Sequence, residues 1–306
     1  MKLENIEFGF DNFLAEMKKL KNEKHFDYLI TIIGEDFGEE EGLGCIYILE
    51  NTQTHERISV KQLAKKVGED YVIPSIYHVW ADVNLLEREV FDFFGIKFLG
   101  HPDMRRLFMR NDFEGYPLRK DFDMSPEKNK FPMTDEPESD WTSEWNLTED
   151  GKLVETKHRL FDEDDYVINF GPNHPSMHGV LRLQTVVDGE TVKHIYPHLG
   201  YIHRGLEKMM ENMTYPQTLA LTDRLNYLCA MHHRHALVGV IEEALGVELN
   251  DRIKYIRTIM DELQRIDNHL LFLGTCAQDL SALTAFLYCM RDREHVPRNN
   301  KWLSIR

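Results

Sequence analysis

The stretch NFGPNHPSMHGVLRLQTVVDGETVKHIYPHLG (169–200) determines how the second half of the chain folds. Its segments VLRLQTVV (180–187) and ETVKHIYP (190–197) flank Asp188-Gly189, and this arrangement predicts a β-hairpin. A further strand is predicted over YVINF (166–170), ahead of a loop at 171–179 with two glycines, two prolines and two histidines. A loop of this composition can present an imidazole to a ligand at little entropic cost.

Three helical stretches follow the hairpin. Residues 215–245 predict a long helix or two shorter ones, and residues 251–273 place apolar side chains on one stripe. Residues 270–290 are long enough to span a bilayer, but they contain Asp279 near the middle, where a carboxylate is costly. We therefore predict a buried helical segment that breaks near Gly274, Asp279 and Ser281, inside a helix bundle.

The first part of the chain has a different pattern. It predicts a helix over 11–21, strands rich in Ile, Val and Tyr over 25–34, 44–50 and 71–80, and a second helix over 84–94. These elements form a small mixed α/β domain. Together with the hairpin and helices that follow, they place the chain in the α+β class.

A strongly acidic segment lies between the two parts. Residues 135–165 contain twelve Asp and Glu against three Lys and Arg, so they carry −9 of the net charge of −16. This composition is typical of a solvated linker, although Trp141 and Trp145 indicate that part of it packs on a neighbour. The sequence therefore predicts domains at 1–130 and 166–306, joined by a linker at 131–165.

The composition argues against several classes of function. The chain has 36 Lys and Arg against 52 Asp and Glu in 306 residues, whereas binding of nucleic-acid phosphates needs clustered cations. No two of the four cysteines form a CxxC pair. We therefore expect no nucleic-acid partner, no disulfide scaffold and no metal or iron–sulfur site of the chain's own.

Histidines are dense in the second half of the chain. His174 and His178 in the Gly/Pro loop either serve a ligand or only hold the backbone of the loop, and the residues alone leave both readings open. His232 and His235 share one face of a predicted helix, but they have no obvious third ligand for a metal.

Three further side chains are candidates for chemistry. A helical tyrosine such as Tyr227 usually packs in a core with its hydroxyl at the edge. Asp279 lies in an apolar run, so it must be paired or protonated if it is buried. Arg204 follows a turn at 197–200 and marks either the start of a helix or a charged site.

Longer motifs in both halves resemble a known family. NFGPNHPSMHGVLRL (169–183), PHLGYIHRGLEK (197–208), DRLNY (223–227) and DLSALTAFLY (279–288) resemble the D subunit of respiratory complex I, the proton-translocating NADH:quinone oxidoreductase. EREVFDFFGIKFLGHPDMRRL (87–107) and EGYPLRKDF (114–122) resemble its C subunit. The order of the two parts is that of the fused C/D subunit of some bacteria. Motifs of this length are far more specific than a short pattern.

The resemblance implies a site for quinone. It places the headgroup pocket at His178, Tyr227 and Asp279, and it places His174 and Arg204 near an iron–sulfur cluster carried by the B subunit. A tyrosine hydroxyl and an imidazole are suited to the two carbonyls of a quinone, because both can donate hydrogen bonds or protons as negative charge develops. A nearby carboxylate would orient the imidazole.

The resemblance also implies the setting of the chain. The B, I and membrane-arm H subunits would be partners, and NADH and FMN would bind elsewhere in the complex. The chain would lie peripherally at the cytoplasmic face of the bacterial inner membrane. Compared with the family, the D-like part contains only the N-terminal portion of a bundle related to the nickel-iron hydrogenase large subunit, which predicts a truncated chain that is inactive alone.

Two other functions remain open at this point. A nickel-iron hydrogenase needs thiolates from CxxC pairs, but the matching stretch here is Asn226-Tyr227-Leu228-Cys229, in which the first cysteine is replaced. A non-catalytic assembly or adaptor protein is the other alternative. Two further departures from the family are Thr284-Ala285-Phe286 in place of TPF and the run HHRH (232–235).

Overall fold

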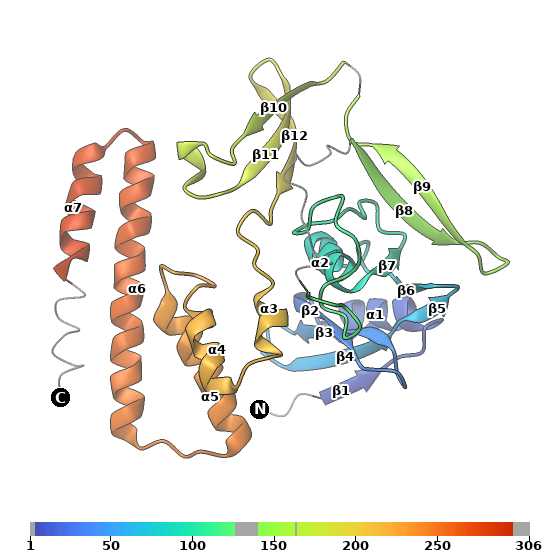
Figure 1. Ribbon diagram of the computed structural model, residues 1–306, viewed down its shortest axis with the longest axis horizontal. Helices are drawn as coiled ribbons and strands as arrows, with labels where there is room; N and C mark the ends of the chain where they lie inside the picture. The colour runs from blue at the N-terminus through green and yellow to red at the C-terminus, as the bar shows by residue number, and fades with distance from the viewer. Residues whose placement is uncertain (1–3, 126–139, 163, 296–306) are drawn as a thin grey trace. The chain divides into compact units, whose positions relative to one another are not determined.

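A four-stranded sheet carries most of the core in the N-terminal part of the chain (Figure 1). The strands are β1 (Glu4–Glu7), β2 (Tyr28–Asp36), β3 (Leu43–Glu50) and β4 (Arg57–Leu63), in the order β1-β4-β3-β2. In this computed structural model, which describes residues 4–125, 140–162 and 164–295, the chain divides into the units Met1–Gly205 and Leu206–Arg306. The two units are therefore described separately.

The two helices predicted from the sequence pack on this sheet. α1 (Phe13–Asn22) buries Phe13, Met17 and Leu20, which recur at helical spacing on one face. α2 (Asn84–Phe94) lies against β2, where a Cβ atom on Gly34 would come within 2.6 Å of the Phe94 ring. The absence of a side chain at this strand position therefore allows the helix to approach the sheet closely.

A second sheet extends this unit in the order β5-β6-β7-β8-β9. Its strands are β5 (Lys65–Val67), β6 (Asp70–Pro74), β7 (Ile96–Leu99), β8 (Trp141–Leu147) and β9 (Leu153–Arg159). The strand predicted over 71–80 is too long, because β6 ends at Pro74. The two residues that follow hydrogen-bond to the Glu87 carboxylate through the Ser75 hydroxyl and the Ile76 amide.

The acidic segment is not only a linker. Residues 126–139 lie outside the described part, but β8 and β9 form an antiparallel hairpin within the segment. β8 pairs with β7 at Leu99 and Trp145, and the Lys97 ammonium lies 3.6 Å from the centroid of the Trp145 ring. Trp145 thus packs on a neighbour as predicted, and the exposed acidic residues Glu149, Asp150 and Glu155 belong to a folded hairpin.

The predicted β-hairpin forms a third sheet, in the order β10-β11-β12. Its strands are β10 (Tyr166–Phe170), β11 (Arg182–Asp188) and β12 (Thr191–His198). Asp188 pairs with Thr191, so the turn is Gly189-Glu190, one residue beyond the predicted Asp188-Gly189. The sheet belongs to the N-terminal unit. Within that unit, the Tyr196 hydroxyl donates to the Leu160 carbonyl, and the Arg105 guanidinium lies over the Tyr196 ring. The division between units at Gly205 therefore falls 40 residues beyond the predicted end of the linker at 165.

The second unit is helical (Figure 1). It contains α3 (Leu206–Met210), α4 (Tyr215–Thr222), α5 (Ala230–Leu245), α6 (Asp251–Asp279) and α7 (Leu283–Arg293). The stretch 215–245 is therefore broken into α4 and α5, and the apolar segment breaks between Asp279 and Leu283 near the predicted position. Ser281 has a φ of 64° at this break, a conformation that does not continue a right-handed helix.

The prediction that the apolar segment is buried is wrong for the described chain. Leu280 is 83% exposed, and Phe272, Leu283 and Leu287 are each more than half exposed. α6 and α7 contact each other around Gly274. The apolar side chains on the outer face of this pair are not covered by any other described residues. Within the described chain, no helix is both long enough and apolar enough to span a bilayer.

Candidate functional site

The loop that carries His178 is closed tightly at its base. Gly171 has a φ of 85°, and a Cβ atom there would come within 1.9 Å of the Leu181 carbonyl oxygen. The two ends of the loop therefore meet without room for a side chain. Arg182, the first residue of β11, donates to the Asn169 side chain of β10 (2.9 Å), which further ties the two ends of the loop together.

His178 is exposed at the end of a short 3-10 turn, Pro175–Met177. Its φ of 48° lies in the left-handed region that favours glycine. Non-glycine residues in this region cost free energy and cluster at functional sites. The conformation of His178 is therefore consistent with use of its imidazole.

His174 instead holds the backbone of the loop. Its Nδ1 atom accepts from the Ser176 amide (3.2 Å) and lies 2.6 Å from the Ser176 hydroxyl. The ring therefore caps the 3-10 turn that ends at His178. The sequence leaves two roles open for His174, ligand binding or support of the loop backbone. The contacts of its Nδ1 atom correspond to support of the loop.

Tyr227 lies in a turn between α4 and α5, not in a long helix as predicted. The Asn226 side chain accepts from the Leu228 amide (3.2 Å), and the Asn226 carbonyl accepts from the Cys229 amide (3.0 Å). The Tyr227 side chain is 69% exposed in the described chain. The turn therefore presents a phenol outward from a hydrogen-bonded backbone.

Asp279 is the last residue of α6 and is exposed beside the break. The position agrees with the prediction, whereas the buried apolar surroundings expected for the carboxylate are absent among the described residues. Arg204 is also exposed. The ring of its neighbour His203 stacks on Phe93 of α2, with centroids 5.1 Å apart.

The candidate residues are distributed over both units. His174, His178 and Arg204 lie in the N-terminal unit, and Tyr227 and Asp279 lie in the helical unit. The convergence of His178, Tyr227 and Asp279 on one pocket therefore stays a prediction. Among the residues that the structure describes, no group of three or more His, Cys, Asp or Glu side chains is arranged to hold a metal ion.

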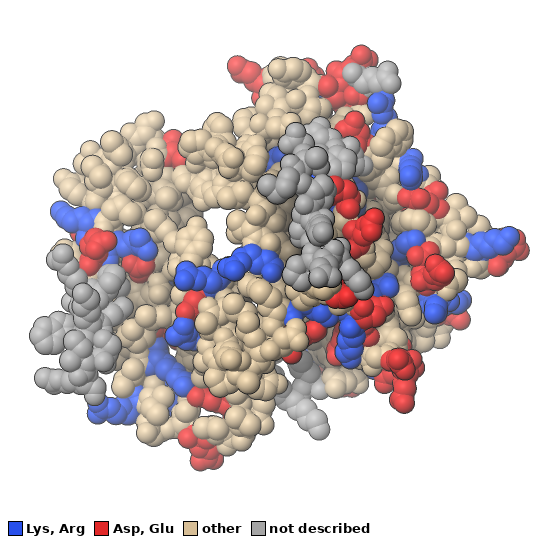
Figure 2. Space-filling view, in the orientation of Figure 1, with Lys and Arg blue, Asp and Glu red and all other residues tan. Residues whose placement is uncertain are grey.

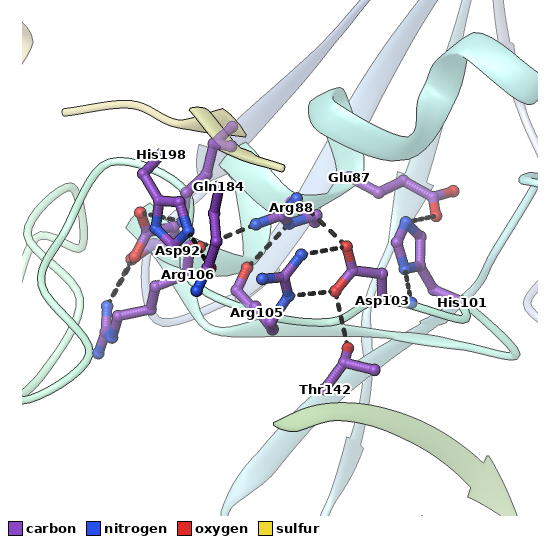
Figure 3. Close-up of polar contacts among 11 residues, drawn as sticks. Glu87, Arg88, Asp92, His101, Asp103, Arg105, Arg106, Thr142, Gln184 and His198 are labelled. Carbon is purple, nitrogen blue, oxygen red and sulfur yellow. Dashed lines mark hydrogen bonds and ion pairs between the residues drawn. The ribbon is translucent and has the colours of Figure 1, made fainter. Parts of the chain in front are cut away.

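A buried cluster of charged residues lies in the N-terminal unit, around α2 and the loop that follows β7 (Figure 3). Arg88 is 4% exposed and donates to the Arg105 and Arg106 carbonyls, and burial lowers its pKa to about 10. Burial alone would raise the pKa of Asp103, but its hydrogen bond with Arg105 and the charge of Arg88 outweigh this and bring it to about 2. These ions hold the loop to the helix.

Asp92 completes this arrangement from the next turn of α2. Its Oδ2 atom accepts from the amides of three successive residues, Leu107, Phe108 and Met109, at 2.7–3.0 Å. Its Oδ1 atom accepts from Arg106 at 2.9 Å. One fully buried carboxylate therefore fixes the loop that leads to Phe108, whose ring stacks on Phe93 at a centroid distance of 5.5 Å.

Glu87 is fully buried at the other side of the cluster. Burial raises its pKa to about 8, against the opposing effect of the hydrogen bonds from Ser75 and Ile76. His101, also fully buried, lies 3.9 Å away, and burial lowers the pKa of its imidazole to about 4. The sequence contained a signal for this cluster, since charged residues recur inside the apolar helix at 84–94 and at 101–106.

On the face drawn in Figure 2, the basic and acidic side chains of the N-terminal unit are interspersed. In the helical unit, the unusual run HHRH (232–235) serves contacts within the bundle. Arg234 donates to Asp223 (3.0 Å), and His235 lies 2.5 Å from Asp261 of α6. Both side chains connect α5 to the segment before it or to the helix after it.

Comparisons with known proteins match different families to the two parts of the chain. A family model described as "Respiratory-chain NADH dehydrogenase, 30 Kd subunit" matches residues 7–128, and one described as "Nickel-dependent hydrogenase" matches residues 204–284. The C/D subunit of the NADH-quinone oxidoreductase of Phocaeicola vulgatus is 52% identical over 293 residues, which is 96% of this chain and 56% of that protein. The C/D 2 subunit of the Aquifex aeolicus enzyme is 38% identical over 95% of this chain and 51% of that protein. The chain belongs to the family of fused C/D subunits of NADH-quinone oxidoreductase.

This C/D chain spans about half the length of the curated relatives that it matches. It covers the C-type domain and part of the D-type region, as the motifs predict. The hydrogenase match lies within and just before the helical unit, which confirms the predicted relationship of that bundle to nickel-dependent hydrogenases. Within the matched range, Asn226-Tyr227-Leu228-Cys229 forms the exposed turn described above and contains only one thiol.

Proposed function

We propose that this C/D chain contributes the quinone-headgroup pocket of the peripheral arm of an NADH:quinone oxidoreductase. Residues 1–130 serve as the C-like part and residues 166–306 as the D-like part. The family membership supports the assignment. The observation that carries it is Tyr227, an exposed phenol on a turn whose neighbouring backbone groups are hydrogen-bonded.

The residues of the pocket have distinct roles in this proposal. The Tyr227 hydroxyl donates a hydrogen bond, and then a proton, to one carbonyl of the quinone as negative charge develops on it. His178 serves the other carbonyl, because an imidazole can donate and accept protons near neutral pH. Asp279 orients and stabilises the imidazolium. Rigid presentation of these groups limits the entropy lost on reaching the reactive geometry.

The remaining parts of the reaction belong to partners. Electrons reach the quinone from an iron–sulfur cluster on the B subunit, with Arg204 and His174 on the side of this chain that faces it. A guanidinium close to a cluster favours its reduced form. The I and membrane-arm H subunits are further partners, NADH and FMN bind elsewhere in the complex, and the chain is peripheral at the cytoplasmic face of the inner membrane. Electron transfer to quinone is coupled to proton translocation by the whole complex, and this chain alone is inactive.

A matched pair of tyrosine variants tests this function in the membrane-bound complex that contains this chain. Tyr227→Phe removes only the hydroxyl, and we expect quinone reduction to fall by about 10²-fold or more while the upstream clusters are still reduced by NADH. Tyr255→Phe is the control, because Tyr255 is 71% exposed on α6 outside the motif. Equal rates of quinone reduction in both variants would reject the role of Tyr227.

A non-catalytic scaffold is the second candidate function. It is favoured by the contrast between the units: the buried apolar cluster lies entirely in the N-terminal unit, whereas α6 and α7 expose large apolar side chains. A scaffold would support assembly of the partner subunits with no dependence on the Tyr227 hydroxyl. Complexes that assemble normally with Tyr227→Phe and reduce quinone at the unaltered rate would favour this alternative.

A further inference from the structure

A side chain on α6 holds the turn that carries Tyr227. It binds a backbone carbonyl that lies 36 residues earlier in the chain. Gln264, on α6, donates from Nε2 to the Leu228 carbonyl at 2.8 Å. The Leu228 amide is bound by the Asn226 side chain at 3.2 Å. Both backbone groups of the residue next to Tyr227 are therefore occupied, one locally and one by α6.

Gln264 is in turn part of a partly buried polar cluster between α6 and α7. Its Nε2 atom lies 3.4 Å from Oδ2 of Asp267, which is only 7% exposed. Arg293, in the last turn of α7, donates from Nη2 to the same oxygen at 3.1 Å, and its Nε lies 3.1 Å from Oδ1. A carboxylate this deeply buried is costly without a partner, so Arg293 fixes its position.

We propose that Gln264, Asp267 and Arg293 are positioning residues that fix the Tyr227 turn from the α6–α7 pair. The proposal rests on the proposed function for its catalytic consequence. Gln264 restrains the Leu228 carbonyl, Asp267 restrains the Gln264 amide, and Arg293 holds Asp267. None of the three needs to touch quinone, because each acts through the backbone beside the tyrosine.

Exchange of backbone amide hydrogens measures this restraint directly. In the assembled complex, Gln264→Leu keeps the size of the side chain and removes the donor, and we expect the Leu228 and Cys229 amides to exchange about ten-fold faster or more. Arg293→Gln should give the same change, and Arg293→Lys should restore much of the protection because it keeps a cation beside Asp267. Arg257→Gln is the matched control, since Arg257 forms a bidentate pair with Glu242 between α6 and α5 without contacting the turn.

Steady-state kinetics measures the consequence. Misplacement of a proton donor lowers the rate of the chemical step more than substrate binding, so kcat for quinone reduction should fall about ten-fold or more in Gln264→Leu, with a smaller change in KM. Arg257→Gln should leave both values near those of the unaltered complex.

The two measurements separate this inference from the proposed function. Unchanged exchange at Leu228 and Cys229 in Gln264→Leu would overturn the inference, even if Tyr227→Phe abolishes quinone reduction. Faster exchange with an unchanged kcat would overturn the catalytic consequence of the restraint. Faster exchange combined with a normal rate in Tyr227→Phe would support the restraint on the turn and reject the proposed function.

Discussion

The buried Glu87 carboxyl predicts a pH dependence of folding stability in the N-terminal unit. Its pKa is about 8 in the folded chain, against an ordinary value of 4.5, because it is removed from water. A group whose pKa is raised on folding contributes stability below its unfolded pKa and loses that contribution as pH rises toward its folded pKa. Between these two pKa values, each pH unit lowers the free energy of unfolding by about 1.4 kcal/mol. Stability should therefore fall by about 2–3 kcal/mol between pH 6 and pH 8.

Other buried groups nearby leave this window largely undisturbed. The pKa of His101 is lowered to about 4 by burial, so its contribution rises with pH mainly below its ordinary pKa of 6.5 and opposes Glu87 by less than about 1 kcal/mol, near the lower end of the window. The buried Cys45 thiol and Tyr47 phenol have pKa values raised by burial above their ordinary values of 9.0 and 10.0, so their contributions change only at higher pH. The interval from pH 6 to pH 8 therefore reports mainly on Glu87.

Urea unfolding at pH 6, 7 and 8 measures the effect. Three of the four tryptophans, at positions 80, 141 and 145, lie in the N-terminal unit, so tryptophan fluorescence follows its unfolding. Glu87→Gln should abolish most of the dependence of stability on pH. Compared with the unaltered chain, the variant should therefore gain more stability at pH 8 than at pH 6. The exposed carboxylate of Asp82 provides the control Asp82→Asn, which should keep the slope of the unaltered chain. A slope in Glu87→Gln equal to that of the control would refute the reasoning.

Three further substitutions test the loops on which the candidate site depends. His178→Gly should change the free energy of unfolding by no more than about 1 kcal/mol, because glycine accepts a φ of 48°, yet it should abolish quinone reduction in the complex. Gly171→Ala should lower the melting temperature, because its Cβ would clash with the Leu181 carbonyl. Asp92→Asn should cost about 3–5 kcal/mol in urea unfolding by weakening the buried pair with Arg106, and a loss below 1 kcal/mol would contradict the role assigned to this carboxylate.

Local sequence patterns predicted much of the architecture. The hairpin that turns at Gly189-Glu190, the helix over 84–94 and the break after Asp279 are all determined by residues close in the chain: a turn dipeptide, an apolar stripe and an interrupted apolar run. The sequence did not predict the acidic hairpin of β8 and β9, because the high net charge of that segment is typical of a solvated linker. Its pairing with β7 at Trp145 depends on a partner more than 40 residues earlier, which charge composition does not reveal.

The buried ions of the N-terminal unit show a second limit of sequence patterns. Charged residues within an apolar helix indicate ion pairs, but they do not indicate which carboxylate is paired with a cation. Asp92 is paired with the Arg106 guanidinium and accepts from three backbone amides. Glu87 accepts from the Ser75 hydroxyl and one backbone amide, and its nearest ring nitrogen, on His101, is 3.9 Å away. The two carboxylates lie on the same helix, and only their three-dimensional partners distinguish the one paired with a guanidinium from the one with a raised pKa.

Tyr227 shows the same limit at the candidate site itself. Residues 215–245 contain enough helix-forming residues to predict a helix through this position, yet the Asn226 side chain binds the Leu228 amide and breaks the helix at the turn. The carbonyl released by that break is then bound by Gln264, which comes from a different helix. A tyrosine inside a continuous helix would have both backbone neighbours committed to the helix itself, and its orientation would depend only on local geometry. In the turn, its orientation depends on α6, and through Asp267 on α7, so substitutions far from the phenol are expected to alter the chemistry that it performs.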